Sequence, residues 1–107
     1  MPRIRYLKPE FFIDEDLAEL PFETRLCFQG LWCHADKAGR LDDKPKTLKF
    51  LIFPYDNIKI EKLLEQLAKP KPSNGFPFIQ RYEVEGQKYI QIVQWNKHQW
   101  PNIKERD

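Results

Sequence analysis

Two apolar stripes at helical spacing, separated by a short run of turn residues, restrict the fold of this chain most. The stripes consist of Leu48, Leu51 and Ile52, and of Ile60, Leu63, Leu64 and Leu67. Apolar residues at i, i+3 and i+4 are typical of a helix with one buried face. Pro54 disfavours helix at the residue before it, and Tyr55-Asp56-Asn57 suits a turn. The pattern predicts helices over residues 44–53 and 58–69.

Both helices carry start signals. Asp43 precedes the first helix, and Pro45 lies in its first turn, where a missing N–H costs nothing. Asp56 or Asn57 is placed to cap the second helix. A side-chain oxygen at such a position accepts hydrogen bonds from the free N–H groups of the first turn. We therefore expect Asp43 and one of Asp56 and Asn57 to be helix caps.

A third helix is predicted earlier in the chain, over residues 21–35. Pro21 suits its first turn, and Glu23 suits the positive end of the helix dipole. Over residues 26–35 the apolar side chains go nearly all the way round the helix. This distribution is typical of a central helix that is buried on several sides.

The segments on either side of this helix are short. Residues 3–7 alternate basic and apolar, as an extended segment does, and Lys8-Pro9-Glu10 opens a turn or short helix through Phe12. After the central helix, Gly39 suits a left-handed turn. Arg40-Leu41-Asp42 is long enough only for a bridging strand.

Residues 76–84 and 87–95 have the pattern of a β-hairpin around Glu85-Gly86. A two-residue turn pairs Val84 with Gln87, Glu83 with Lys88, and Tyr82 with Tyr89. Opposite charges and paired aromatic rings are both favourable across strands, which supports this register.

Both faces of the predicted hairpin carry apolar residues. One face holds Ile79, Ile90 and Ile92, and the other holds Phe78, Tyr82, Tyr89, Val93 and Trp95. One layer of helices covers only one face. The second face needs the N-terminal segment, the segment around Trp100, or a second copy of the chain. If a second copy covers it, the expected self-association residues are Phe78, Tyr82, Tyr89 and Trp95. Stacking of single-stranded nucleic acid is disfavoured, since it needs aromatic rings on a basic surface.

Helix, short strand, helix, turn, helix and hairpin is the element order of a winged helix. This α+β fold has a three-helix core that contains a helix-turn-helix, and a two-stranded hairpin as the wing. The length of 107 residues suits one domain. We expect the winged-helix domain to span residues 1–95. The polar segment 96–107 is expected to lead to a further domain.

In a helix-turn-helix, the outer face of the second helix enters the major groove, and the wing lies beside the duplex. The candidate residues for contact with double-stranded DNA on that helix are Lys59, Lys62 and Lys69, for phosphates, and Gln66, for an adenine edge. Gln87 and Lys88 lie at the hairpin tip. Arg3 and Arg5 extend the basic surface if the N-terminal segment lies along the wing.

Charge leaves an alternative open. Glu61 and Glu65 share the outer face of the second helix and repel phosphate, so its lysines are also those of an ordinary solvated face. Residues 10–23 hold six acidic residues and no basic one, although the net charge of the chain is +2. The rest of the chain is therefore distinctly basic, which favours an anionic partner. The alternative function is a winged helix that binds a protein or dimerises in a replication or transcription-regulatory complex.

Other classes of function find little support. No apolar run reaches the roughly 18 residues of a membrane span, and we expect a cytoplasmic protein without a membrane partner. Cys27 and Cys33 do not face each other around a helix, and no tight ligand spacing joins them to His34 or His98. We expect the cysteines in the core and the histidines at the surface or hydrogen-bonded, with no metal site.

Catalysis would need a nucleophile beside a base, or clustered carboxylates on a metal. The only serine is Ser73, in a proline-rich loop, and Asp14, Glu15 and Asp16 are consecutive, so their side chains diverge. With four glycines, the chain has no glycine-rich phosphate loop. We expect neither an enzyme nor a cofactor.

Several segments together resemble a known family. They are residues 3–12 (RIRYLKPEFF), 20–26 (LPFETRL), 30–32 (GLW) with Ala35-Asp36, 52–56 (IFPYD) and 95–101 (WNKHQWP). They are similar to the N-terminal domain of phage replisome organisers and DnaD-like replication initiators. The resemblance implies an N-terminal winged helix, origin binding, self-association and work with a helicase-loading protein. It leads us to expect a DNA-binding domain of a phage-type replication initiation protein.

Overall fold

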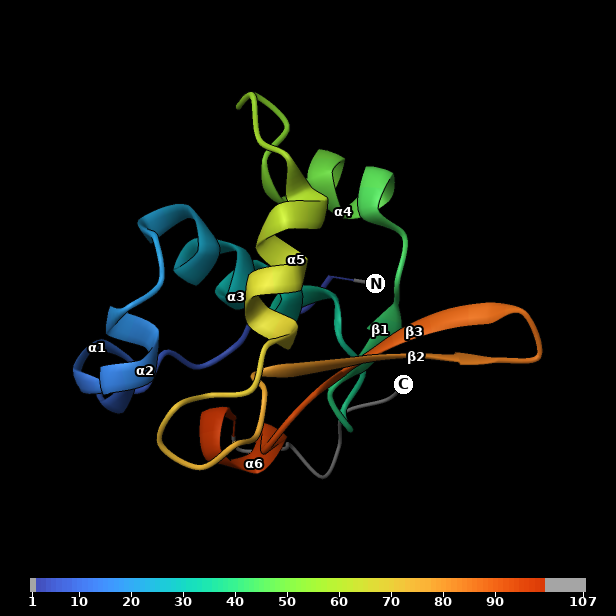
Figure 1. The fold of residues 1–107 in the computed structure, drawn as a ribbon. Helices are drawn as coiled ribbons and strands as arrows, with labels where there is room; N and C mark the ends of the chain where they lie inside the picture. Colours follow the sequence, from blue (N-terminus) through green and yellow to red (C-terminus); the bar gives the residue numbers. More distant parts are fainter. Residues whose placement is uncertain (1, 100–107) are drawn as a thin grey trace.

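The computed structural model describes residues 2–99, which form an α+β fold with six helices and three strands (Figure 1). The elements are α1 (Glu10–Ile13), α2 (Glu15–Ala18), α3 (Phe22–His34), β1 (Arg40–Asp42), α4 (Pro45–Ile52), α5 (Ile60–Ala68), β2 (Ile79–Val84), β3 (Gln87–Ile92) and α6 (Trp95–His98). The predicted central helix, the bridging strand, the following two helices and the hairpin are confirmed. None of the helices among residues 2–99 combines the length and apolar character that a membrane crossing requires.

The sheet is antiparallel, with β1 and β2 on either side of β3. The predicted register is confirmed: Tyr82 lies opposite Tyr89, and Glu83 lies opposite Lys88. Glu85 and Gly86 both have positive φ, 50° and 83°, as a two-residue turn of this twist requires. The hairpin β2–β3 projects past the helices on the side opposite α1 and α2 (Figure 1).

The core lies between α3, α5 and one face of the sheet. All four apolar residues of the α5 stripe are buried, as predicted. Cys27 and Phe28 of α3 are completely buried, and so are Ile79, Ile90 and Ile92 of the sheet. The apolar stripe of α5 therefore orients this helix, and its opposite face is turned to solvent.

The predicted helix caps are wrong. Among the side chains of residues 43–59, none caps α4 or α5. The carboxylate of Asp43 is bound to Arg81 instead. Asp56 and Asn57 lie three and two residues before Lys59, the residue that precedes α5. The connection between α4 and α5 covers residues 53–59 and is longer than predicted.

The N-terminal segment packs against the end of α3 and against α6 and Gln99. The Arg5 guanidinium donates to the carbonyls of Trp32 and Ala35, at 2.9 and 2.8 Å, and lies 5.0 Å from the centre of the Trp95 ring. The Tyr6 N–H donates to Gln99 Oε1, and Gln99 Nε2 donates back to the Tyr6 carbonyl. Of the expected covers, the N-terminal segment therefore reaches Trp95, whereas Tyr82 and Tyr89 of the same predicted face stay half-buried. Trp100 lies outside the described residues.

The polar segment expected after Trp95 does not begin as a tail. Its first residues belong to α6, and His98 and Gln99 are buried, with 8% and 1% of their surface exposed. The Gln99 side chain is fixed in place because its amide accepts a hydrogen bond from the Tyr6 N–H and donates one to the Tyr6 carbonyl. The packed part of the chain thus extends to Gln99, and residues 100–107 lie outside the described part.

His98 is buried among aromatic rings, so the surface position, one of the two alternatives expected for it, is wrong. Its ring stacks on Trp32, with centroids 5.5 Å apart, and meets the edge of Phe28 at 5.1 Å. Burial, and secondarily the charge of Lys97, lowers the pKa of His98 from 6.5 to about 4. The imidazole is therefore neutral in the fold at neutral pH.

We expect His98 to make stability depend on pH. The unfolded chain takes up a proton near pH 6.5, whereas the folded chain takes it up only near pH 4. The contribution of neutral His98 to the free energy of unfolding is therefore fully present above pH 6.5. The free energy of unfolding falls by about 3 kcal/mol as the pH drops from 6.5 to 4. Urea denaturation across this range measures it. His98→Phe keeps the ring stack and should remove this slope; an unchanged slope in that variant would contradict the assignment.

The contact between α3 and α4 depends on Gly30. An added Cβ at Gly30 would lie 2.7 Å from Cγ2 of Ile52. Ile52 is half-buried on α4, next to Leu48 in the core, whereas Leu51 of the same predicted stripe is 44% exposed. Glycine thus permits the close approach of the two helices.

Gly30→Ala should destabilise the domain by about 1–3 kcal/mol, although alanine is the better helix former by about 1 kcal/mol. The cost arises because the new methyl overlaps the Ile52 side chain. In an Ile52→Ala background the overlap is absent, and the same change should be neutral or stabilising. Chemical denaturation of the four proteins of this cycle measures both effects, and equal effects in the two backgrounds would refute the contact.

Candidate nucleic-acid interface

The solvent-facing side of α5 carries three exposed lysines. Lys62 lies on the helix, and Lys59 and Lys69 flank its ends. Glu61 and Glu65 are exposed on the same helix. The structure therefore places the predicted phosphate contacts at the surface, among residues of both signs.

Gln66 does not belong to this outer face. It is half-buried, and its Oε1 accepts a hydrogen bond from the hydroxyl of Thr24, a completely buried residue of α3. The expected position of Gln66 is wrong because its side chain serves the packing of α5 against α3. An adenine contact by Gln66 would require this bond to break.

Arg81 of β2 joins the hairpin to the two helices. Its Nε and Nη2 donate to Asp43, at 2.6 and 3.0 Å, and its Nη2 also donates to Glu61 Oε1 at 2.9 Å. The second Glu61 oxygen accepts from Arg81 Nη1. Asp43 lies in the connection between β1 and α4, and Glu61 lies in the first turn of α5. One guanidinium therefore sets how the hairpin lies against both helices.

The electrostatics follow from this geometry. Hydrogen bonds from Arg81, and more weakly the charges of Arg81 and Lys88, hold the pKa of Glu61 below its usual range. The same bonds raise the pKa of Arg81. Lys88 of β3 acts on Glu61, so Lys88 lies near the first turn of α5, and Gln87 is exposed next to it in the chain. These residues form the candidate interface.

Arg5 of the N-terminal segment does not join it. Arg5 is bound to the last carbonyls of α3 and stacked on Trp95. The Arg3 N–H donates to the carbonyl of Cys33, also near the end of α3. The expectation that they extend the basic surface along the wing is wrong for Arg5, because its guanidinium is committed to packing. Arg3 is half-buried beside it.

The predicted self-association residues divide into two groups. Phe78 and Trp95 are buried, with 4% and 6% of their surface exposed. Phe78 packs on Phe28, and Trp95 Nε1 donates to the Lys37 carbonyl at 2.8 Å. Strand alternation does not apply to them, because both lie outside β2 and β3. Tyr82 and Tyr89 are half-buried on the outer face of the sheet, where the sequence placed them.

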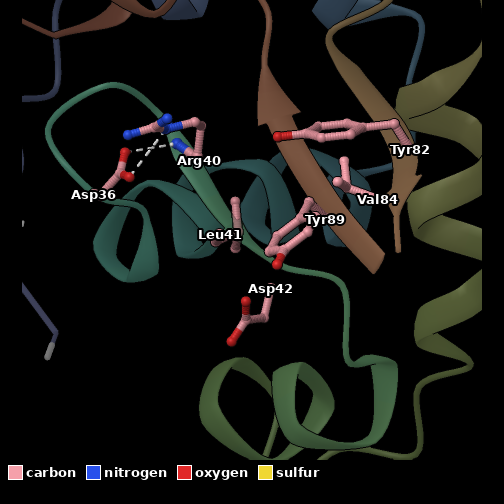
Figure 2. A pocket seen from close by; sticks show the side chains of 7 residues that line it. All are labelled: Asp36, Arg40, Leu41, Asp42, Tyr82, Val84 and Tyr89. Atoms are coloured by element: carbon pink, nitrogen blue, oxygen red, sulfur yellow. Dashed lines mark hydrogen bonds and ion pairs between the residues drawn. The ribbon is translucent and has the colours of Figure 1, made fainter. Parts of the chain in front are cut away.

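A hollow of about 380 Å³ opens on this outer face (Figure 2). Its lining comprises Asp36, Arg40, Leu41, Asp42, Tyr82, Val84 and Tyr89. The rings of Tyr82 and Tyr89 lie 5.7 Å apart, tilted by 32°. The hollow lies away from α5, which packs on the inner side of the sheet.

Residues suited to catalysis or metal binding do not converge. Among residues 2–99, no group of three or more His, Cys, Asp or Glu side chains is arranged to hold a metal ion. Burial raises the pKa of the Cys27 thiol to about 12, which keeps it protonated. Ser73 donates to Asp16 Oδ2 in an exposed loop. These observations supply no candidate catalytic centre within the described residues.

Comparison of the chain with family models, with curated proteins and with solved structures gives no match in any of the three. The fold and the surfaces described above therefore carry the functional argument.

The Arg81 bridge should stabilise the domain measurably. The Asp43 side chain is only 4% exposed, so Arg81→Ala leaves a buried carboxylate without its cation. Breaking such a pair costs about 3 kcal/mol. Glu61 is 51% exposed, and Glu61→Gln should cost less than about 1 kcal/mol. Denaturant titrations of both variants measure the loss in free energy of unfolding. Equal losses in the two variants would contradict a larger contribution from the Arg81–Asp43 pair.

Proposed function

We propose that this chain is a winged-helix domain that binds double-stranded DNA. In this proposal α4 and α5 form the helix-turn-helix, α5 enters the major groove, and the hairpin is the wing. The observation that carries it is the three exposed lysines on and beside α5, together with Lys88 of the hairpin, which is near enough to Glu61 of α5 to act on its carboxylate. The order α3, β1, α4, α5, β2, β3 supports the assignment of the fold.

The charge of the surface supports phosphate contacts of moderate strength. Glu61, which repels phosphate, is bound by Arg81, so part of its charge is compensated within the protein. Glu65 remains exposed. Lysines reach phosphates without base specificity, so Lys59, Lys62, Lys69 and Lys88 position the domain on the duplex. In this proposal sequence preference rests on few side chains, since Gln66 is engaged with Thr24.

We further propose that the domain acts in the initiation of replication. The resemblance of the opening and closing segments to phage replisome organisers and DnaD-like initiators supports a place in the initiation of replication. A helicase-loading protein and a second copy of the chain are the partners that this role suggests. Within the resembling segments 20–26 and 30–32, Thr24, Leu31 and Trp32 are buried, so this part of the likeness concerns the fold, whereas Phe22 and Leu26 are exposed.

A salt series with duplex DNA tests the proposal. Affinity should fall steeply with salt, because bound lysines release counterions from the DNA. Lys59→Ala, Lys62→Ala and Lys88→Ala should each weaken binding and reduce the salt slope by about 1. Lys97→Ala on α6 is the matched control, since it removes an exposed lysine away from the hairpin tip. Absence of affinity at low salt, or equal effects of all four variants, would rule the interface out.

A further inference from the structure

We infer that the hollow on the outer face of the sheet binds the arginine side chain of a basic segment in a partner protein. The inference does not depend on DNA binding by α5, because the hollow and α5 belong to opposite sides of the sheet. It rests on the aromatic rings of the hollow, its charge and its shape.

The aromatic part consists of two tyrosines from neighbouring strands. Tyr82 and Tyr89 are cross-strand partners and are both half-buried, so their rings form a fixed wall and still meet solvent. Val84 and Leu41 complete the apolar lining. Aromatic faces attract cations, and a planar guanidinium also stacks on them.

The charged part of the lining leaves one carboxylate in excess. Arg40 Nε is paired with Asp36 Oδ2 at 3.1 Å, and Asp36 Oδ1 accepts from the backbone N–H groups of Ala38 and Arg40. Asp42 is 64% exposed, and its closest cation is Lys44 Nζ, 4.0 Å away and equally exposed. Asp42 is therefore the carboxylate that remains accessible to a ligand, and the lining carries a net negative charge.

The arrangement of these groups fits an extended cationic side chain. Figure 2 shows Asp42 at one end of the hollow, close to Tyr89, and the Asp36–Arg40 pair at the other end. A guanidinium that stacks on Tyr89 can pair with Asp42 through two N–H groups, while its aliphatic part lies against Tyr82 and Val84. Lysine offers a point charge without this planar match.

The same charges disfavour other occupants. A nucleotide that stacks on the tyrosines would bring its phosphate toward Asp42; of the nearby cations, Arg40 is paired with Asp36, and Lys44 lies 4.0 Å from Asp42. An acidic peptide meets the same repulsion. A second copy of this chain would need to insert an arginine; Arg5, Arg25 and Arg81 are each bound within the described fold, and the other arginines make a second copy an outcome of the test.

The test uses the full 107-residue chain, labelled with ¹⁵N, and a capped Ala-Arg-Ala peptide. Backbone NMR shifts of Asp42, Val84 and Tyr89 should change saturably with peptide. The matched peptides carry lysine, glutamate or citrulline in place of arginine; citrulline keeps the planar shape without the charge. We expect weaker binding with lysine and none with glutamate or citrulline. Equal shifts with citrulline, or shifts confined to other residues, would overturn the inference.

Two variants localise the effect. Asp42→Asn and Tyr89→Leu should each reduce affinity for the arginine peptide about tenfold, since each removes one of the two attractions. Asp56→Asn, which neutralises an exposed carboxylate in the α4–α5 connection, should leave affinity unchanged. Equal loss in all three variants would indicate general charge attraction and overturn the site.

Further titrations separate the competing occupants. Stronger shifts of the same residues with oligothymidylate would assign the hollow to single-stranded DNA, and concentration-dependent shifts without peptide would assign it to a second copy. Either result overturns the inference. Duplex binding should be the same for the parent chain and Asp42→Asn, so failure at the hollow is distinguishable from failure at α5.

Discussion

The arrangement of this domain depends on the ion pairs that Arg81 of β2 makes with Asp43 and Glu61. Helices α4 and α5 are short, and their apolar stripes fix which side faces the core but not how the hairpin lies beside them. Arg81 supplies that constraint, because its planar guanidinium binds one carboxylate before α4 and another in the first turn of α5. A guanidinium is suited to this task, since its donors form a rigid fork.

Local pattern predicted the elements well, because each depends on nearby residues. The α5 stripe, the break at Pro54 and the hairpin register around Glu85-Gly86 all follow from spacing and turn chemistry. The positions of Phe78 and Trp95 could not be obtained that way. Strand alternation stops at Ile79 and Ile92. Beyond these residues the positions of the side chains depend on packing in the core, as for Phe78, which packs on Phe28 of α3.

The candidate interface was predicted only in part, for a related reason. Exposed lysines need no partner, so Lys59, Lys62 and Lys88 could be assigned from helix and strand periodicity. Polar residues with distant partners could not. Asp43 resembles a helix cap, Gln66 an outward side chain and Arg5 part of a basic surface. Each of these side chains is hydrogen-bonded to a residue at least 27 positions away in the chain. The spacing of residues in the sequence does not predict such long-range pairs.

The reciprocal bonds between Tyr6 and Gln99 join positions 93 residues apart. The segment before α1 is therefore fastened to the residue that follows α6. Replacing the Gln99 amide would leave both backbone groups of Tyr6 without these partners and so loosen the two segments together.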